Sequence, residues 1–192
     1  MKNAPIHVAI VEDDPEIRQL LQLLVDGSPG FSCKLVYPNA ELALAEIPTY
    51  PPDVVLMDIQ LPGMSGIECV KALRKKRPEL DILMLTVQME DSAIFDSLCA
   101  GANGYLLKET PPVELLAAIK DAHAGGAPMS PQIARRVIAS FHQVRNTESP
   151  LSERETEVLQ LLCDGADYRL IAEKLFVSTN TVKAHIKNIY KK

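Results

Sequence analysis

The chain has 192 residues, of which 47% are hydrophobic and 23% are charged, and its formal net charge is −5. This composition is typical of a folded globular protein and excludes a disordered chain. The length allows one ordinary domain and a small one. No apolar run is long enough to cross a membrane, and the N-terminus lacks the apolar core of a signal peptide, so we expect a cytoplasmic protein.

The first 125 residues alternate apolar segments with amphipathic ones. We predict strands over 7–11, 33–37, 53–57, 81–87 and 104–108. We predict helices over 15–27, 40–47, 65–80, 89–101 and 110–126, with Ser65 and Thr110 as N-caps of the third and fifth helix. Five strand–helix units with short connections predict an α/β fold with a doubly wound, five-stranded parallel sheet.

The strand–helix alternation ends near residue 125. Residues 130–144 are predicted to form a helix within a linker of residues 126–149. Three further segments with a helical period follow, at 151–165, 168–177 and 178–192, and the first begins with a capping box of Ser152 and Glu155. The last two segments are joined by a tight turn, which indicates a helix-turn-helix. We therefore expect a first domain at 1–125 and a small all-α domain at 150–192.

Charge is distributed unevenly along the chain. From Ser178 onward there are four lysines and no acidic residues, whereas the rest of the chain is acidic. A basic end on an acidic chain points to a polyanionic partner, although a solvated helix face has the same composition. The four scattered cysteines, Cys33, Cys69, Cys99 and Cys163, are expected to be small buried residues and not a disulfide frame or a zinc site.

Polar residues lie at the ends of four of the five predicted strands. The acidic run 12–14 lies at the end of the first strand, Asp58 at the end of the third, Thr86 at the end of the fourth and Lys108 at the end of the fifth. If the strands are ordered 2-1-3-4-5, the first and third are neighbours at the topological switch point, where such sheets bind ligands. Clustered carboxylates repel one another unless a cation compensates, and Mg²⁺ prefers oxygen ligands. The pattern indicates a pocket for a phosphoryl group on a metal.

Each of these residues has a plainer explanation when it is taken alone. The acids at 12–14 can be a charge cluster at a helix N-terminus, Thr86 an ordinary strand residue and Lys108 a solvated side chain. Their joint placement at the ends of four different strands favours the pocket.

The motifs VEDD, MDIQLPGMSG, LT and GYLLK occur in this order between residues 11 and 108. Together they resemble the receiver domain of two-component response regulators over residues 6 to about 124. The whole chain resembles the NarL/FixJ-type transcription factors, which pair that receiver with a LuxR-type helix-turn-helix. The resemblance implies a flavodoxin-like receiver of strand order 2-1-3-4-5. It also implies that a sensor histidine kinase phosphorylates Asp58 in the presence of Mg²⁺.

The same resemblance implies a role for each pocket residue. Asp13, Asp58 and the backbone carbonyl of Gln60 would bind Mg²⁺, with Glu12 contributing indirectly, while Thr86 and Lys108 would bind the phosphoryl group and Tyr105 would act as a switch. The chemistry fits, because phosphoryl transfer mainly requires positioning and charge neutralisation. For Tyr105 the alternative is an ordinary strand aromatic with its hydroxyl in water. Gln60 and Gln88 are candidates for tuning hydrolysis of the phosphoryl group.

In the last segment, Val182, Ile186 and Ile189 fall on one helical face, which we expect to pack on the preceding helix, with lysines pointing away. The resemblance to the LuxR-type helix-turn-helix implies base-edge contacts and phosphate contacts with promoter DNA. The base-edge contacts would come from Lys183, Ala184 and Lys187, and the phosphate contacts from Thr179, Thr181 and Lys191. It also implies a homodimer on phosphorylation, and a family pattern that continues beyond Lys192 into a final dimerisation helix.

We therefore expect a DNA-binding response regulator that is a stoichiometric phosphoryl acceptor and not a turnover enzyme. It would also catalyse its own phosphorylation and some of its own dephosphorylation. Two alternatives remain. One is a Mg²⁺-dependent phosphohydrolase, which would need a second acid where Gln60 stands. The other is a receiver that acts only as a protein-binding adaptor.

Overall fold

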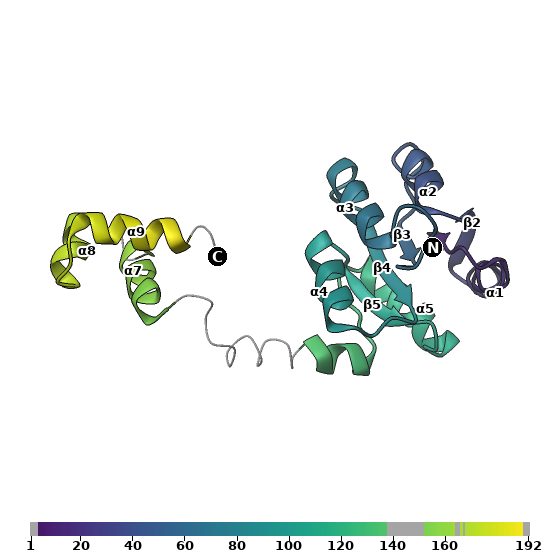
Figure 1. The fold of residues 1–192 in the computed structure, drawn as a ribbon. Coiled ribbons are helices and arrows are strands. Elements are labelled where there is room, and N and C mark those ends of the chain that lie inside the picture. The colour runs from purple at the N-terminus through teal and green to yellow at the C-terminus, as the bar shows by residue number, and fades with distance from the viewer. Residues whose placement is uncertain (1–3, 138–151, 164–165, 167, 190–192) are drawn as a thin grey trace. The chain divides into compact units, whose positions relative to one another are not determined.

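The computed structural model describes residues 4–137, 152–163, 166 and 168–189. The chain divides into two compact units, residues 1–140 and 141–192 (Figure 1). Within the described residues, no helix has both the length and the apolar character needed to span a membrane.

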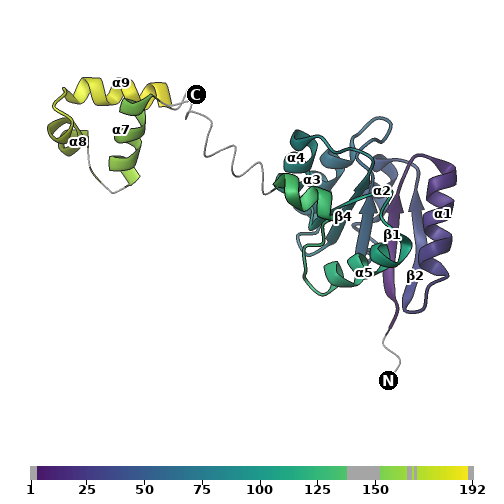
Figure 2. The same ribbon diagram turned by 90° about the horizontal axis from the view of Figure 1, so that it is seen from below.

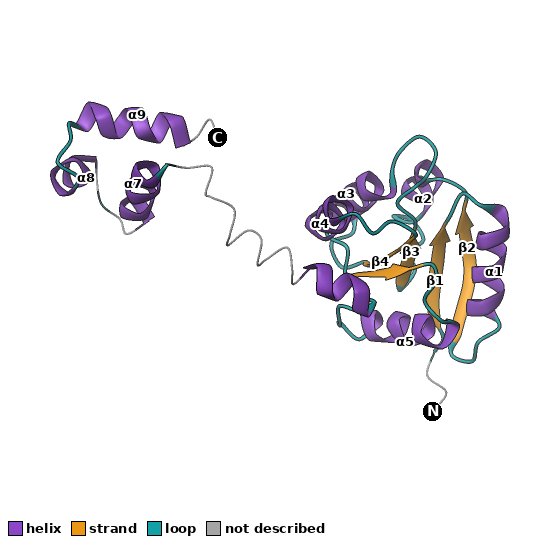
Figure 3. Cartoon of the chain, turned by 60° about the horizontal axis from the view of Figure 1, so that its bottom comes forward, coloured by secondary structure: helices purple, strands orange, loops and turns teal. Residues whose placement is uncertain are grey.

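The first unit is built on a parallel sheet (Figure 3). Its strands are β1 (Ile6–Val11), β2 (Phe31–Tyr37), β3 (Val54–Met57), β4 (Asp81–Thr86) and β5 (Gly104–Leu107), in the order β2-β1-β3-β4-β5. The helices between and after them are α1 (Pro15–Asp26), α2 (Ala40–Glu46), α3 (Gly66–Lys76), α4 (Asp91–Ala100) and α5 (Pro112–His123). The predicted doubly wound sheet and its strand order are confirmed.

Helices cover both faces of this sheet, with α1 and α5 on one face and α2, α3 and α4 on the other (Figure 2). Alternate strand residues enter two separate cores: Val11 and Met57 pack on the α2–α4 side, whereas Ile10 and Leu56 pack on the α1–α5 side. Because the strands are buried on both faces, their sequences are continuous apolar runs instead of alternating ones.

Side-chain caps start several of the helices. The Asp14 carboxylate accepts from the N–H groups of Glu16 and Ile17. Ser65 is the N-cap of α3, as predicted, and also forms a capping box with Glu68. The prediction of Thr110 as the N-cap of α5 is wrong. The helix begins after Pro111, which makes no side-chain cap bond, and its first residue, Pro112, has no N–H to donate.

The chain that follows α5 packs on the edge of the sheet. Residue 129 pairs with Tyr105 of β5 in a parallel bridge, and a helix runs over the described residues 131–137. The rest of the predicted helix at 130–144 lies outside the described residues. Ile133 of this helix is fully buried in the core on the α2–α4 side. This stretch is therefore packed as part of the first unit.

The second unit contains the helices α7 (Glu153–Cys163), α8 (Tyr168–Lys174) and α9 (Thr179–Ile189). Their shared core includes Val158, Ile171 and Val182, all fully buried, and Ile186 packs beside them, as predicted for two of the three residues on that face. The side chain of the third, Ile189, is not described. The capping box at the start of α7 is confirmed, because Ser152 and Glu155 exchange two bonds.

The expected burial of the cysteines holds for two of the four. Cys33 and Cys69 are buried, and burial raises the pKa of each thiol to about 12. Cys99 is exposed on α4, so the prediction is wrong for this residue. It lies on the outward side of a helix whose inward residues are Ile94 and Ser97. The side chain of Cys163 lies outside the described residues.

Candidate functional site

The polar residues that follow the strands meet at one edge of the sheet. Backbone hydrogen bonds to the neighbouring strand hold these residues. Glu12 N–H donates to the Tyr37 carbonyl, and Asp58 N–H donates to the Val11 carbonyl, each with a donor–acceptor distance of 3.0 Å. Lys108 N–H donates to the carbonyl of Thr86 over the same distance. The rigid sheet therefore fixes the position of each side chain at its carboxyl edge, as the sequence predicted.

Lys108 joins two of the acids. Its ammonium Nζ lies 2.6 Å from Glu12 Oε2 and 2.7 Å from Asp58 Oδ2. The two carboxylates are almost completely buried, with side-chain exposures of 1% and 4%. Buried carboxylates are costly to ionise unless a positive group pairs with them, and Lys108 is such a group for both.

Asp13 completes an acidic cluster with these two residues. Within the described residues, Glu12, Asp13 and Asp58 form the one group whose possible ligand atoms lie within 4.8 Å of one another. Asp13 is exposed, so the cluster opens to solvent on one side. Three carboxylates against one ammonium leave negative charge in the pocket. A set of oxygen donors with room for water fits Mg²⁺.

The electrostatics of the pocket agree with this interpretation. Burial raises the pKa of Glu12, and the bond and charge of Lys108 offset only part of that effect. Burial alone would lower the pKa of the Lys108 ammonium, but Asp58 and Glu12 together outweigh it and raise the pKa. The lysine therefore stays charged, whereas Glu12 ionises less readily than a free carboxyl and would gain from a further cation.

The loop after Asp58 packs closely around its backbone. Asp58 Oδ1 accepts from the N–H groups of Ile59 at 2.7 Å and Gln60 at 3.4 Å. Gly66 starts α3 so near that a Cβ there would lie 1.8 Å from the Asp58 carbonyl oxygen. The glycine of the MSG motif is therefore needed for this close approach of helix and strand end.

Thr86 and Tyr105 both bond to the backbone of Gln88. Both side chains are fully buried. The Thr86 hydroxyl accepts from the Gln88 N–H at 3.3 Å, and the Tyr105 hydroxyl donates to the Gln88 carbonyl at 3.0 Å. The alternative of a strand aromatic with its hydroxyl in water is therefore wrong, because this side chain points inward to a backbone partner. Both residues hold the start of the β4–α4 connection.

Two contacts around the site were not predicted. The Arg18 guanidinium of α1 donates to the backbone carbonyls of Glu12 and Asp13, at 2.6 and 3.0 Å. It therefore holds the backbone of the acidic run in place. Glu41 of α2 accepts from the N–H of Met64 in the loop after Asp58. Both side chains act on backbone atoms, which leaves no motif at their own positions.

In the second unit, α9 separates a buried face from an exposed one. Thr179, Lys183 and Ala184 are exposed, opposite the buried Val182 and Ile186. Lys187 lies within α9, but its side chain is not described, and Lys191 lies outside the described residues.

The N-terminus of α9 is capped by Ser178. Its hydroxyl accepts from the N–H of Thr181 at 3.1 Å and lies 2.8 Å from the Thr181 hydroxyl. Both polar groups of Thr181 thus have a local partner, which reduces what they can offer to a DNA phosphate. Thr179 remains exposed at the same end of the helix.

Comparisons with known proteins cover both units. The family described as response regulator receiver domain matches residues 8–120, and that of bacterial regulatory proteins of the luxR family matches residues 149–192. The transcriptional regulatory protein DegU of Brevibacillus brevis is 31% identical over 97% of this chain and 87% of its own. The nitrate/nitrite response regulator protein NarL of Escherichia coli is 30% identical over 98% and 89%.

A solved structure is similar as well. A crystal structure of a LuxR-family two-component response regulator from Aurantimonas is 30% identical, with a TM-score of 0.68. The match covers 72% of this chain and 99% of the Aurantimonas chain.

Proposed function

The chain belongs to the response regulators that join a receiver domain to a LuxR-type DNA-binding domain, and from this premise we propose that Asp58 is its phosphoryl acceptor. The observation that carries the proposal is the position of Lys108, which lies within ion-pair distance of both Asp58 and Glu12 at the carboxyl edge of the sheet. The matched relatives are transcription regulators, which favours this function over a phosphohydrolase.

The pocket residues divide the work of phosphoryl transfer. Asp58 supplies the carboxylate oxygen that attacks phosphorus, while the bond from phosphorus to the donor breaks and the kinase histidine, or the acetate of acetyl phosphate, leaves. The N–H groups of Ile59 and Gln60 hold the other oxygen of Asp58 in place. Lys108 neutralises Asp58 before the reaction, and its flexible ammonium can follow the charge onto the phosphoryl oxygens. The hydroxyl of Thr86 would hydrogen-bond the same group.

The acidic cluster would hold Mg²⁺ through Asp13, Asp58 and the Gln60 carbonyl, with Glu12 acting indirectly. When bound, the metal supplies positive charge against the phosphoryl oxygens. The chain's own part is to place hard oxygen donors within 4.8 Å of one another and to leave one side open.

Phosphorylation of Asp58 would then reach the rest of the protein through Thr86 and Tyr105. Their shared partner, Gln88, begins the connection to α4, so movement of Thr86 toward a phosphoryl oxygen would take its hydroxyl away from the Gln88 N–H and release that segment. A sensor histidine kinase would supply the phosphoryl group, and the phosphorylated chain would bind promoter DNA as a homodimer.

The contacts with DNA would come from α9 and the residues after it. Base edges would be contacted by Lys183, Ala184 and Lys187, and phosphates by Thr179, Thr181 and Lys191.

Incorporation of phosphate from acetyl phosphate with Mg²⁺ tests the acceptor. Asp58→Asn should abolish incorporation, whereas Asp53→Asn, an acid at the opposite edge of the sheet, should leave it unchanged. Undiminished incorporation in Asp58→Asn would place the acceptor elsewhere. A mobility-shift assay with promoter DNA, with and without acetyl phosphate, tests the coupling and separates a regulator from an adaptor that never binds DNA.

A further inference from the structure

The loop between β3 and α3, residues 59–65, has one hydrogen bond to an element other than its two neighbours. The Met64 N–H donates to Glu41 Oε1 on α2 at a distance of 2.8 Å. All of these residues are described, and their other hydrogen bonds are local. Ile59 and Gln60 N–H donate to Asp58 Oδ1, Leu61 and Gly66 N–H donate to the Ile59 carbonyl, and Ser65 bonds within α3. Glu41 is therefore the hydrogen-bonded support of the loop from outside.

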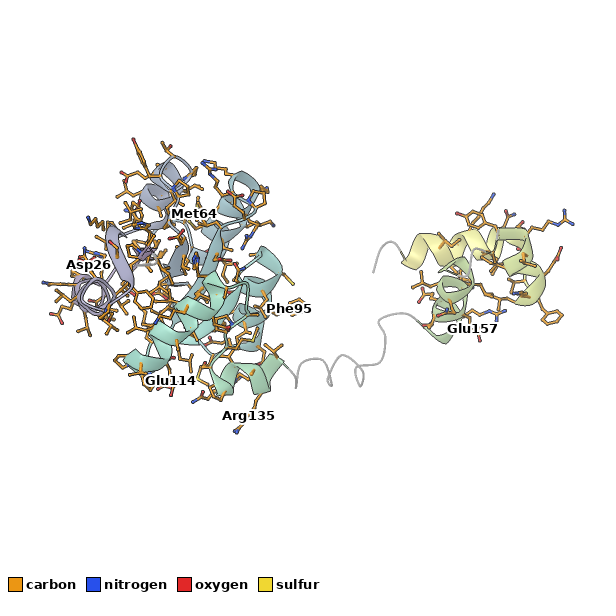
Figure 4. All side chains as sticks on the ribbon, turned by 180° about the vertical axis from the view of Figure 1, so that it is seen from behind. Asp26, Met64, Phe95, Glu114, Arg135 and Glu157 are labelled. Carbon is orange, nitrogen blue, oxygen red and sulfur yellow. The ribbon has the colours of Figure 1, made fainter. Side chains whose placement is uncertain are left out.

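The neighbouring residue is shaped to this contact. Gly63 has a φ of +77°, a left-handed conformation that a side chain rarely adopts. A Cβ on Gly63 would lie 2.5 Å from Glu41 Oε1. Only glycine thus permits both the turn and the approach of the carboxylate. Figure 4 labels Met64 on the side of the receiver formed by α2 and α3, where the two segments meet.

Glu41 makes this contact from an exposed position. Its residue is solvent-accessible on the first turn of α2, while Ala40 and Ala43 beside it are buried in the core. An exposed carboxylate is not required for packing, so its removal leaves the core intact. The one hydrogen bond described for its side chain is the one to the loop.

The loop matters to the site because of what it carries. It follows Asp58 directly, and its second residue, Gln60, is the one whose carbonyl would complete the metal ligands in the proposed function. Mg²⁺ requires near-ideal octahedral geometry, so a carbonyl on a loop that can shift binds it poorly. A support four residues away on the same short loop restricts that shift.

We propose that Glu41 is a positioning residue that holds the β3–α3 loop in the conformation that presents the Gln60 carbonyl to Mg²⁺. This rests on the proposed function of the acidic pocket. Glu41 acts through the Met64 N–H and does not itself contact the metal. Its role therefore depends on a hydrogen-bond acceptor at this position and not on negative charge.

Two substitutions separate the acceptor from the charge. Glu41→Ala removes both, whereas Glu41→Gln keeps an oxygen that can accept from Met64 and removes the charge. Glu46→Ala, on the last turn of the same helix, removes an equal charge without a hydrogen bond to the loop and is the matched control. Asp13→Asn serves as the pocket control.

The full chain is titrated with Mg²⁺ by calorimetry, which suits a protein without tryptophan. Loss of one hydrogen bond corresponds to an affinity about fivefold weaker in Glu41→Ala. Glu41→Gln and Glu46→Ala should bind like the wild type. In EDTA, amide hydrogen exchange at Met64 should be faster in Glu41→Ala alone, a readout that needs no metal.

Wild-type Mg²⁺ affinity in Glu41→Ala would overturn the proposal, and so would a loss in Glu41→Gln as large as in Glu41→Ala, because the charge would then be responsible. Failure of the proposed function has a different signature. In that case the wild-type chain would bind no more Mg²⁺ than Asp13→Asn, and the role of Glu41 would be lost with it.

Discussion

The backbone N–H of Tyr105 donates to the carbonyl of Pro128 at 3.0 Å, and the Tyr105 carbonyl accepts in return from the N–H of Ser130 at 3.2 Å. The chain after α5 thereby extends the sheet at the edge of β5. Gly104 makes this possible, because a Cβ there would lie 2.3 Å from the Pro128 carbonyl oxygen. The proposed switch residue is thus bonded through its hydroxyl to the β4–α4 connection and through its backbone to the chain that leads to the second unit.

The first prediction concerns the helix that follows this contact. Ile133→Ala in the full chain should lower the free energy of unfolding of the receiver by about 2–5 kcal/mol, because Ile133 is fully buried in the same core as Tyr105. The free energy of unfolding is measured by urea unfolding that is monitored through amide hydrogen exchange at β5. Arg136→Ala is the control. It breaks only an exposed pair with Asp91, so a change of at most about 1 kcal/mol is expected. Equal effects of the two substitutions would mean that the helix is not part of the receiver core.

The second prediction tests the charge of Lys108. Lys108→Met keeps the apolar stem but removes the partner of two buried carboxylates, and should destabilise the metal-free chain by up to about 3 kcal/mol. The same variant should bind Mg²⁺ more tightly, because a cation that competes for the same oxygens is gone. Urea unfolding in EDTA and calorimetric titration measure the two effects. Weaker Mg²⁺ binding would place Lys108 among the residues that organise the metal ligands.

The third prediction is a pH dependence. Burial raises the pKa of Glu12 above its ordinary value of 4.5. The folded state then holds this proton more tightly than the unfolded state, so the associated stability is present below pH 4.5 and is lost as the pH rises through the raised pKa. Glu12→Gln does not titrate. In EDTA, the wild-type chain should therefore lose thermal stability relative to this variant as the pH rises toward neutrality.

Mg²⁺ should reverse that trend, because it stabilises the ionised carboxylates. Melting temperatures measured across the pH range, with EDTA and with saturating Mg²⁺, give both comparisons. If the wild type instead gained stability over the variant with rising pH in EDTA, the pairing with Lys108 would outweigh the burial of Glu12.

Much of the receiver could be predicted because its signals are local. An apolar run marks each buried strand, and the polar residue at its end marks the edge where the ligand pocket lies, so Asp58, Thr86 and Lys108 could be found from position alone. The strand order then brought their neighbourhoods together without any knowledge of side-chain contacts.

The residues that were missed act through contacts with backbone atoms. Glu41 contacts Met64, and Arg18 contacts the carbonyls of Glu12 and Asp13, through backbone atoms that carry no sequence signature. The Thr110 cap failed for a local reason, since two prolines follow it and Pro112 offers no N–H. The inward position of Tyr105 depended on a backbone carbonyl, that of Gln88, whose direction a strand pattern does not specify.

The last prediction addresses DNA recognition by α9. Lys183 is exposed beside Ala184 on the face opposite the buried Val182, so Lys183→Ala should remove a contact at a base edge. A good contact of this kind corresponds to about 1–3 kcal/mol and to relaxed preference at one base pair. Lys174→Ala, on the exposed side of α8, removes the same charge and is the control; it should cost less and leave the preference unchanged.

Affinity for duplexes selected from a random-sequence pool, measured over a range of salt concentrations, separates the two kinds of contact. A residue that only neutralises a phosphate lowers the slope of log affinity against log salt by about 1, without changing base preference. If Lys183→Ala behaved in that way, Lys183 would belong with the phosphate contacts. The base-edge role would then fall to Ala184 and Lys187, which the same selection on variants at those positions would reveal.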